Sequence, residues 1–203
     1  MKKYNFMTIG CDCTPAYALK DLNLREQSLP FDWITSNVDA LYKCFKNNFI
    51  DFHTELKYTI SKKRVVDAYG FQYPHDYPVI NEIDPINQEP KEIIIPDLSD
   101  YYDTVKEKYD RRIKRFLDIV HDPLPLIILC RYKMSDVFII HFLLYKFYNK
   151  RNVIFINSTD EILDDTPFIK NCYTEKNGIW NETAIWKQKI DEVIELLVGV
   201  EDA

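Results

Sequence analysis

The prediction of the fold starts from LIILCRYKMSDVFIIHFLLYKFYNKRNVIFIN, residues 126–157. Its two ends, residues 126–131 and 153–157, are short apolar runs, as in buried strands. The segment between them, residues 136–150, predicts a helix. A strand, a crossover helix and a second strand of about thirty residues in total form a βαβ unit. The two strands are therefore predicted to be parallel neighbours in one sheet.

The rest of the chain predicts further strands and helices around this unit. Thr14 is expected to cap the helix that follows it, and Ser36 or Asn37 the next one. A long helix is expected to be capped by Ser99 or Asp100. The predicted strands lie at residues 4–9 and 168–173, and the predicted helices at residues 14–22, 38–47, 99–121 and 181–198.

Residues 50–98 differ from the rest of the chain. They are rich in Tyr, Pro, His and Asp, and they show only weak periodicity. A long irregular segment within a compact domain is more often a functional loop or lid than a plain connector. The chain is therefore predicted to be one α/β domain, residues 1–203, in which helices cover a mostly parallel sheet and residues 50–98 form a long irregular insertion.

The composition excludes several classes of function. The chain of 203 residues has 26 Lys and Arg against 32 Asp and Glu, a net charge of −6, so no broad nucleic-acid binding is expected. Its four glycines leave no Gly-rich phosphate loop. No apolar run suits a membrane span or a signal peptide. Five cysteines without an export signal indicate free thiols, so we expect a cytoplasmic protein without a membrane partner.

Residues 8–19, TIGCDCTPAYAL, place two cysteines between a strand and a helix. Cys13 directly precedes the helix, whose dipole and free N–H groups lower the pKa of a thiol, so Cys13 is expected to be a reactive thiolate. Cys11 belongs to the strand end. Asp12 opposes thiolate formation unless it caps the helix or orients a base. The alternative is that both cysteines only fill a tight corner.

Polar residues recur where the predicted strands end. Cys11, Cys13, Arg131 and Asn157 all lie at or just after a strand end. In parallel sheets, ligands bind outside the carboxyl ends of the strands, so we expect these residues to lie close together. Arg131 ends a buried strand, where a charge needs a partner or a functional role.

A cysteine nucleophile needs a base, and His75 is the histidine that lies in the irregular segment between two prolines, in YPHDYP. Asp76 follows it, but sequence neighbours do not naturally form the Asp–His hydrogen bond of a triad. His53 is ambiguous, whereas His121 and His141 suit structural roles on helices. The Cys-x-Cys spacing does not match a zinc site, and neither a metal nor a cofactor is expected.

Other residues are candidates for ligand binding. Arg111 and Arg115 lie four apart on one helix face, with Lys108 one turn earlier. They either bind phosphate or carboxylate groups or pair with acidic neighbours on a solvated face. In the block PFDW, aromatic residues including Trp33 flank Asp32. Asp32 either orients a base or acts as a cap or turn residue.

The order of these blocks resembles a known family. The series TIGCDCTPAYALKDLNLREQSLPFDWITSN, NNFIDF, YGFQYPHDY, KEKYDRRIKRFLDIV and LIILCRY is similar, over roughly residues 5–160, to proteins catalogued as papain-like cysteine peptidases. Members of this family occur in bacteria and in large DNA viruses. The resemblance implies a thiol hydrolase and, for a viral member, a location in the host cytoplasm.

The family pattern can be placed on this chain residue by residue. Its cysteine falls on Cys13, its histidine–aspartate pair on His75 and Asp76, and its PFDW block on residues 30–33. Thr8 stands where the family has Ser. Papain-like enzymes pack their nucleophile helix against an antiparallel sheet, whereas the βαβ unit predicts a parallel one. The family arginines fall on Arg111, Arg112, Arg115 and Arg131.

These residues together predict a cysteine-dependent hydrolase or acyl transferase that acts on a peptide, an isopeptide or another amide. Cys13 is the expected nucleophile, and His75 the general base and acid. Asp32 or Asp76 is expected to orient His75. Backbone N–H groups of residues 13–15, the proline excluded, are expected to form part of an oxyanion hole. The predicted substrate-binding residues are Trp33, Arg111, Arg115 and Arg131.

Two alternatives from other classes stay open. In the first, Arg111, Arg115 and Arg131 clamp the phosphate of a phosphorylated or nucleotide-sugar ligand, which His75 and Asp76 position. In the second, the chain is a non-catalytic interaction protein of viral type. The sequence determines neither the substrate nor the oligomeric state.

Overall fold

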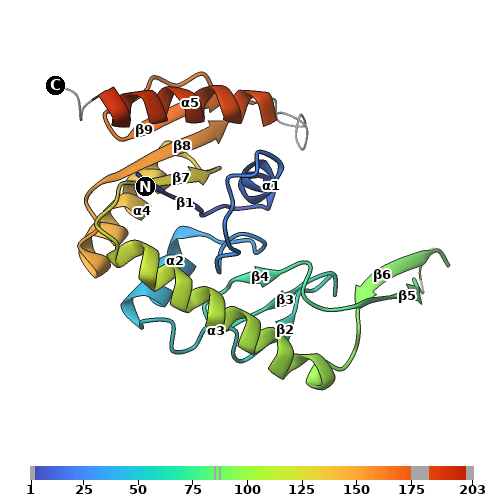
Figure 1. Ribbon diagram of the computed structural model, residues 1–203. Coiled ribbons are helices and arrows are strands. Elements are labelled where there is room, and N and C mark those ends of the chain that lie inside the picture. The colour runs from blue at the N-terminus through green and yellow to red at the C-terminus, as the bar shows by residue number, and fades with distance from the viewer. Residues whose placement is uncertain (1–2, 85, 87, 175–182, 200–203) are drawn as a thin grey trace.

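The computed structural model describes residues 3–84, 86, 88–174 and 183–199 (Figure 1). It contains the predicted βαβ unit. Strand β7 (Leu126–Cys130) and strand β8 (Val153–Thr159) flank helix α4 (Met134–Tyr148). The two strands are parallel, with Leu126 opposite Val153. Every residue of β7 is buried because the strand is covered on both faces.

Within the described residues, the main sheet has four strands in the order β1-β7-β8-β9. Strand β1 spans Asn5–Thr8, strand β9 spans Ile169–Tyr173, and every pairing is parallel. Helices α1 (Thr14–Asp21) and α5 (Thr183–Gly199) cover one face of the sheet, and α4 covers the other (Figure 1). The predicted α/β class with a mostly parallel sheet is thereby confirmed.

The segment of residues 50–98 was predicted to be irregular, but its described residues include short strands. A strand of two residues is too short to show an alternating pattern, and every residue of the hairpin strand β5 is exposed. Figure 1 shows that this hairpin projects away from the main sheet. The strands are β2 (Lys57–Tyr58), β3 (Val65–Val66) and β4 (Gln72–Tyr73) in one antiparallel sheet, and β5 (Val79–Ile83) and β6 (Pro90–Ile94) in the hairpin.

A cluster of phenylalanine rings joins this segment to helices α2 (Val38–Lys46) and α3 (Ser99–His121). The ring of Phe31 is fully buried at its centre. Its centroid lies 5.5 Å from that of Phe116 in α3 and 5.6 Å from that of Phe71 in the insertion. Tilted and edge-to-face aromatic pairs stabilise a core beyond the burial of their area. The other rings around Phe31 are those of Phe45, Phe49 and Phe52, at 6.0, 6.1 and 6.3 Å.

One of the three predicted helix caps is present in the structure. Asn37 caps α2 as predicted, by accepting the N–H of the third helical residue. Thr14 was predicted to cap α1, but it is the first helical residue, and its N–H donates to Oδ1 of Asp12 (2.8 Å). In the same way Ser99 begins α3 and donates its N–H to Asp97. An aspartate can accept the N–H two residues further on, which shifts the capping residue toward the N-terminus.

His53 lies at the centre of the insertion and is fully buried. Its Nε2 lies 2.8 Å from the hydroxyl of Tyr77, and its Nδ1 has no partner among the described residues. Burial lowers the pKa of His53 from 6.5 to about 4, so this imidazole is neutral near pH 7. The rings around it are those of Tyr73, Tyr77, Tyr102 and Tyr109.

Acidification is expected to destabilise the fold through His53. Because its pKa is about 4 in the folded chain and 6.5 as the ordinary value, the unfolded chain binds the proton first as the pH falls. The stabilising contribution is complete above pH 6.5, and about 2 kcal/mol of it is lost by pH 5. Urea unfolding at pH 8 and pH 5 measures this loss. The variant His53→Phe is expected to lose less free energy of unfolding between pH 8 and pH 5 than the wild-type chain. Equal losses in the two proteins contradict the assignment of this pH dependence to His53.

Candidate active site

Cys13 and His75 come together from two distant segments of the chain. Cys13 lies in the turn between β1 and α1, and His75 lies in the loop that follows β4. The Sγ of Cys13 is 3.5 Å from the Nε2 of His75. Cys13 is buried, whereas His75 is exposed. The two residues predicted to form a nucleophile–base pair therefore lie within reach of a sulfur–nitrogen hydrogen bond.

The turn that carries Cys13 depends on a close approach of its backbone. The carbonyl oxygen of Gly10 accepts hydrogen bonds from the N–H and the hydroxyl of Ser36, at 3.2 and 2.8 Å. A Cβ atom on residue 10 would lie 2.7 Å from the carbonyl oxygen of Asp12, closer than real Cβ contacts. Glycine at this position therefore lets the chain turn tightly between the strand and the helix.

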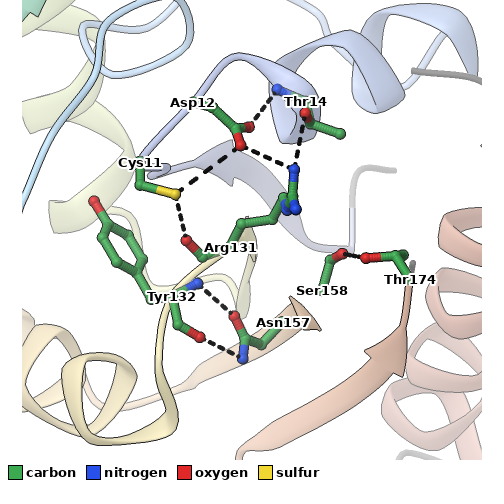
Figure 2. A network of polar contacts seen from close by, with 8 residues as sticks. All are labelled: Cys11, Asp12, Thr14, Arg131, Tyr132, Asn157, Ser158 and Thr174. Atoms are coloured by element: carbon green, nitrogen blue, oxygen red, sulfur yellow. Dashed lines mark hydrogen bonds and ion pairs between the residues drawn. The ribbon is translucent and has the colours of Figure 1, made fainter. Parts of the chain in front are cut away.

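Asp12 occupies the N-terminus of α1. One of its carboxylate oxygens accepts the N–H of Thr14, and the other pairs with the guanidinium of Arg131 at 2.9 Å. Figure 2 shows the Arg131 side chain reaching from the end of β7 to Asp12 and to the hydroxyl of Thr14. Asp12 thus caps the helix, which was one of the two roles open for it, and its charge is paired.

The electrostatics of Cys13 differ from the expectation. Burial and the neighbouring carboxylate of Asp12 raise the pKa of the Cys13 thiol from 9.0 to about 11. The helix N-terminus was predicted to hold a thiolate, but burial and the opposing charge of Asp12 at the same helix end outweigh the effect of the helix dipole. Cys13 therefore keeps its proton near neutral pH, and a base must remove it before the sulfur can react.

Asp76 anchors the loop of His75 to helix α3. Its two carboxylate oxygens accept hydrogen bonds from the ammonium group of Lys108 and from the hydroxyl of Tyr109. The next residue, Tyr77, contacts buried His53. In the described part of the chain, neither oxygen of Asp76 bonds to His75. The carboxylate is therefore in place to hold the loop, whereas its predicted role as the direct orienter has no supporting contact.

Asp32 is buried beside the end of β1. It accepts hydrogen bonds from the hydroxyl of Thr8 (2.8 Å) and the N–H of Leu29 (2.9 Å), and Arg25 lies 3.8 Å away. Burial raises the pKa of Asp32, and these hydrogen bonds oppose that rise. Among the described residues it makes no hydrogen bond to His75. Asp32 thus ties the PFDW block to the strand that precedes Cys13.

The predicted substrate-binding residues take separate partners. The guanidinium of Arg111 is exposed and lies 3.8 Å from the carboxylate of Glu107, as on a solvated helix face. Arg115 donates to the carbonyl oxygen of Ser28 (3.3 Å). The ring of Trp33 stacks under the guanidinium of Arg25, at 5.3 Å. With Arg131 bound to Asp12, the structure shows no shared contact among the three arginines of the proposed phosphate clamp in its described residues.

Cys11 and Arg131 meet at the carboxyl ends of the strands, as predicted. The thiol of Cys11 donates to the carbonyl oxygen of Arg131 at 2.9 Å. Asn157 lies within β8, two residues before its end, and bonds both main-chain groups of Tyr132, which fixes the start of α4 (Figure 2). A crevice of about 700 Å³ opens here. Cys11 lines this crevice, whereas Cys13 does not and instead contacts His75.

Sequence reasoning missed Arg64 as a neighbour of Cys13. Its positive charge lowers the pKa of the Cys13 thiol, against the larger effects of burial and Asp12. Arg64 lies in the hairpin between β2 and β3, in a run of basic residues that resembles any exposed turn. No spacing rule connects residue 64 to residue 13, because only the folded insertion brings them together.

The described residues contain no group of three or more His, Cys, Asp or Glu side chains that could hold a metal ion. None of their helices is both long and apolar enough to cross a membrane.

Comparisons with known proteins agree with the geometry. Residues 4–152 match the family model described as "Putative papain-like cysteine peptidase (DUF1796)". An uncharacterized protein of Acanthamoeba polyphaga mimivirus is 30% identical over 133 residues, which cover 55% of this chain and 54% of that protein. The chain thus spans about half the length of the curated relative that it matches. No solved structure matches the chain significantly. Because the family model covers well over half of its residues, the chain belongs to this family.

Proposed function

We propose that the chain is a cysteine-dependent hydrolase, either a thiol peptidase or another amide or acyl hydrolase. The observation that carries this proposal is the 3.5 Å contact between Sγ of Cys13 and Nε2 of His75. Both residues lie within the segment that matches the family model. A thiol and an imidazole in contact are the minimal set for nucleophilic catalysis on a carbonyl group.

His75 acts as a general base, because Cys13 is protonated at rest. The Cys13 sulfur attacks the carbonyl carbon of an amide or ester and forms a carbon–sulfur bond, while its proton passes to Nε2 of His75. His75 then gives this proton to the leaving amine or alcohol as the carbon–nitrogen or carbon–oxygen bond breaks. Water, deprotonated by His75, attacks the acyl group on Cys13 and releases the acid and the thiol.

The hydrogen bonds at the turn reduce the number of N–H groups available for the predicted oxyanion hole. The N–H of Thr14 donates to Asp12 and is therefore occupied. Of the two N–H groups predicted for the hole, that of Cys13 has no hydrogen-bond acceptor among the described residues. A nucleophile's own N–H is well placed for the oxyanion that forms on the attacked carbonyl. Cys13 thus supplies both the sulfur and one backbone donor.

The test uses hydrolysis of fluorogenic peptide amides and aryl esters by the wild-type chain and by His75→Ala. Loss of the base is expected to lower the rate at pH 7.5 by about a hundredfold or more. Alkylation of Cys13 in His75→Ala is expected to rise steadily with pH toward the thiol pKa of about 11. Mass spectrometry of the intact chain detects the acyl group on Cys13.

The control is His121→Ala, which removes an exposed histidine in the last turn of α3 and is expected to leave the rate unchanged. A wild-type chain in which no substrate or electrophile modifies Cys13 contradicts the proposal and favours a non-catalytic interaction protein. Full activity of His75→Ala contradicts the role of the base alone.

A further inference from the structure

Arg64 connects the two segments that carry the Cys13–His75 pair. Its Nη1 donates to Oγ1 of Thr35 (3.1 Å) and to Oε1 of Gln72 (3.2 Å). The backbones of Thr35 and Gln72 also pair with each other. Thr35 precedes Ser36, which binds Gly10 of the cysteine turn, and Gln72 lies three residues before His75. The guanidinium is therefore anchored to the strand that leads to His75 and to the residue next to the partner of the cysteine turn, and its charge reaches the Cys13 thiol.

The charges around Cys13 leave Arg64 as an uncompensated cation. The negative charges of three carboxylates raise the pKa of the Cys13 thiol, and each of these carboxylates pairs with a cation of its own. The positive charge of Arg64 lowers the pKa of the thiol. In the described part of the chain, its guanidinium contacts neutral oxygens and no carboxylate. The carboxylate–cation pairs are Asp12 with Arg131, Asp76 with Lys108 and Asp32 with Arg25.

The guanidinium also keeps an open edge. Arginine has five N–H donors in a planar fork, and both hydrogen bonds of Arg64 to the protein come from Nη1. Among the described residues, Nε and Nη2 have no hydrogen-bond partner. These two nitrogens form the edge that suits a carboxylate held by two parallel hydrogen bonds. Arg64 is an exposed residue, so a ligand can reach this edge.

We propose that Arg64 binds a carboxylate of the substrate next to the acyl group that Cys13 attacks. This inference rests on the proposed hydrolase function and narrows its substrate class. The substrate is an amide or ester with a carboxylate close to the scissile bond, such as an acidic residue or a terminal carboxyl group in a peptide. Cys13 attacks the carbonyl while Arg64 holds the charge and so fixes the orientation of the bond.

Two alkylating reagents that differ by one charge test this assignment. Iodoacetate carries a carboxylate beside its reactive carbon, and iodoacetamide carries a neutral amide of similar size. The chain is used with Cys11→Ser, because Cys11 and Cys13 fall in the same tryptic peptide. The ratio of the alkylation rate constants at Cys13, iodoacetate over iodoacetamide, is expected to fall about fivefold in Arg64→Gln. A charge near the thiol changes this ratio, whereas a general loss of reactivity does not.

The controls separate charge from structure. Lys63→Gln removes the neighbouring charge of the same exposed hairpin and is expected to keep the ratio within about twofold. Arg64→Lys keeps the charge and is expected to retain most of the preference, even if Arg64→Gln disturbs the hairpin. An equal fall of both rate constants in Arg64→Gln, or an equal ratio in all variants, overturns the inference and leaves the proposed function intact. Absence of any alkylation at Cys13 contradicts the nucleophile itself, and with it this inference.

Discussion

Replacing Cys13 with alanine is expected to lower the rate of amide or ester hydrolysis by at least about a thousandfold. The variant lacks the atom that forms the bond to the acyl group, so His75 has no proton to accept from a nucleophile. The loss is measured as the steady-state rate of hydrolysis of the fluorogenic peptide amide or aryl ester that the wild-type chain cleaves fastest. Labelling by a thiol-directed probe at this site is expected to disappear at the same time.

Cys11→Ser is the matched control for this experiment. Cys11 lies two residues away in the same turn, and its thiol donates to the carbonyl oxygen of Arg131, which a serine hydroxyl can also do. The variant is therefore expected to keep both fold and rate. If Cys13→Ala retains more than about a tenth of the wild-type rate, the sulfur of Cys13 is not the nucleophile.

Phe31→Ala is expected to have the largest effect on stability, about 4 kcal/mol of the free energy of unfolding. The ring of Phe31 is fully buried and packs against phenylalanines from α2, α3 and the insertion. Alanine leaves a cavity at the point where these elements meet, and the surrounding rings can fill it only in part. Urea unfolding monitored by circular dichroism measures the change.

Ile60→Ala is the control for this loss, because Ile60 is a large apolar side chain that is fully exposed in the β2–β3 hairpin. Its replacement is expected to change the free energy of unfolding by no more than about 0.5 kcal/mol. An effect of Phe31→Ala below about 1 kcal/mol contradicts the central position of this ring in the core.

The sequence predicts the main sheet well because its strands are apolar on both faces. The runs at β7 and β8, with a helix between them, allow few arrangements other than a parallel pair. The strands of the insertion were missed because β2, β3 and β4 have two residues each. Their pairing depends on contacts between distant segments, such as the bridge between Thr35 and Gln72, and these leave no local pattern.

The candidate site was predictable in its residue types and less so in its electrostatics. Position singled out Cys13, and the family pattern singled out His75 among the four histidines. The partners of Asp76 could not be predicted, because Lys108 and Tyr109 lie more than thirty residues away on α3. The pKa of Cys13 was predicted in the wrong direction, since the charge of Asp12 and the depth of burial both depend on how the turn folds.

The carboxylate at the start of α1 also affects how this thiol withstands peroxides. Oxidants attack the thiolate and react poorly with the protonated form. With a pKa of about 11, roughly one Cys13 side chain in ten thousand is ionised at pH 7. A cysteine that stays protonated until a bound substrate and His75 draw off its proton is resistant to sulfenic acid formation between turnovers. Burial and the charge of Asp12 therefore protect this thiol from oxidation, and Asp12 also shapes its turn.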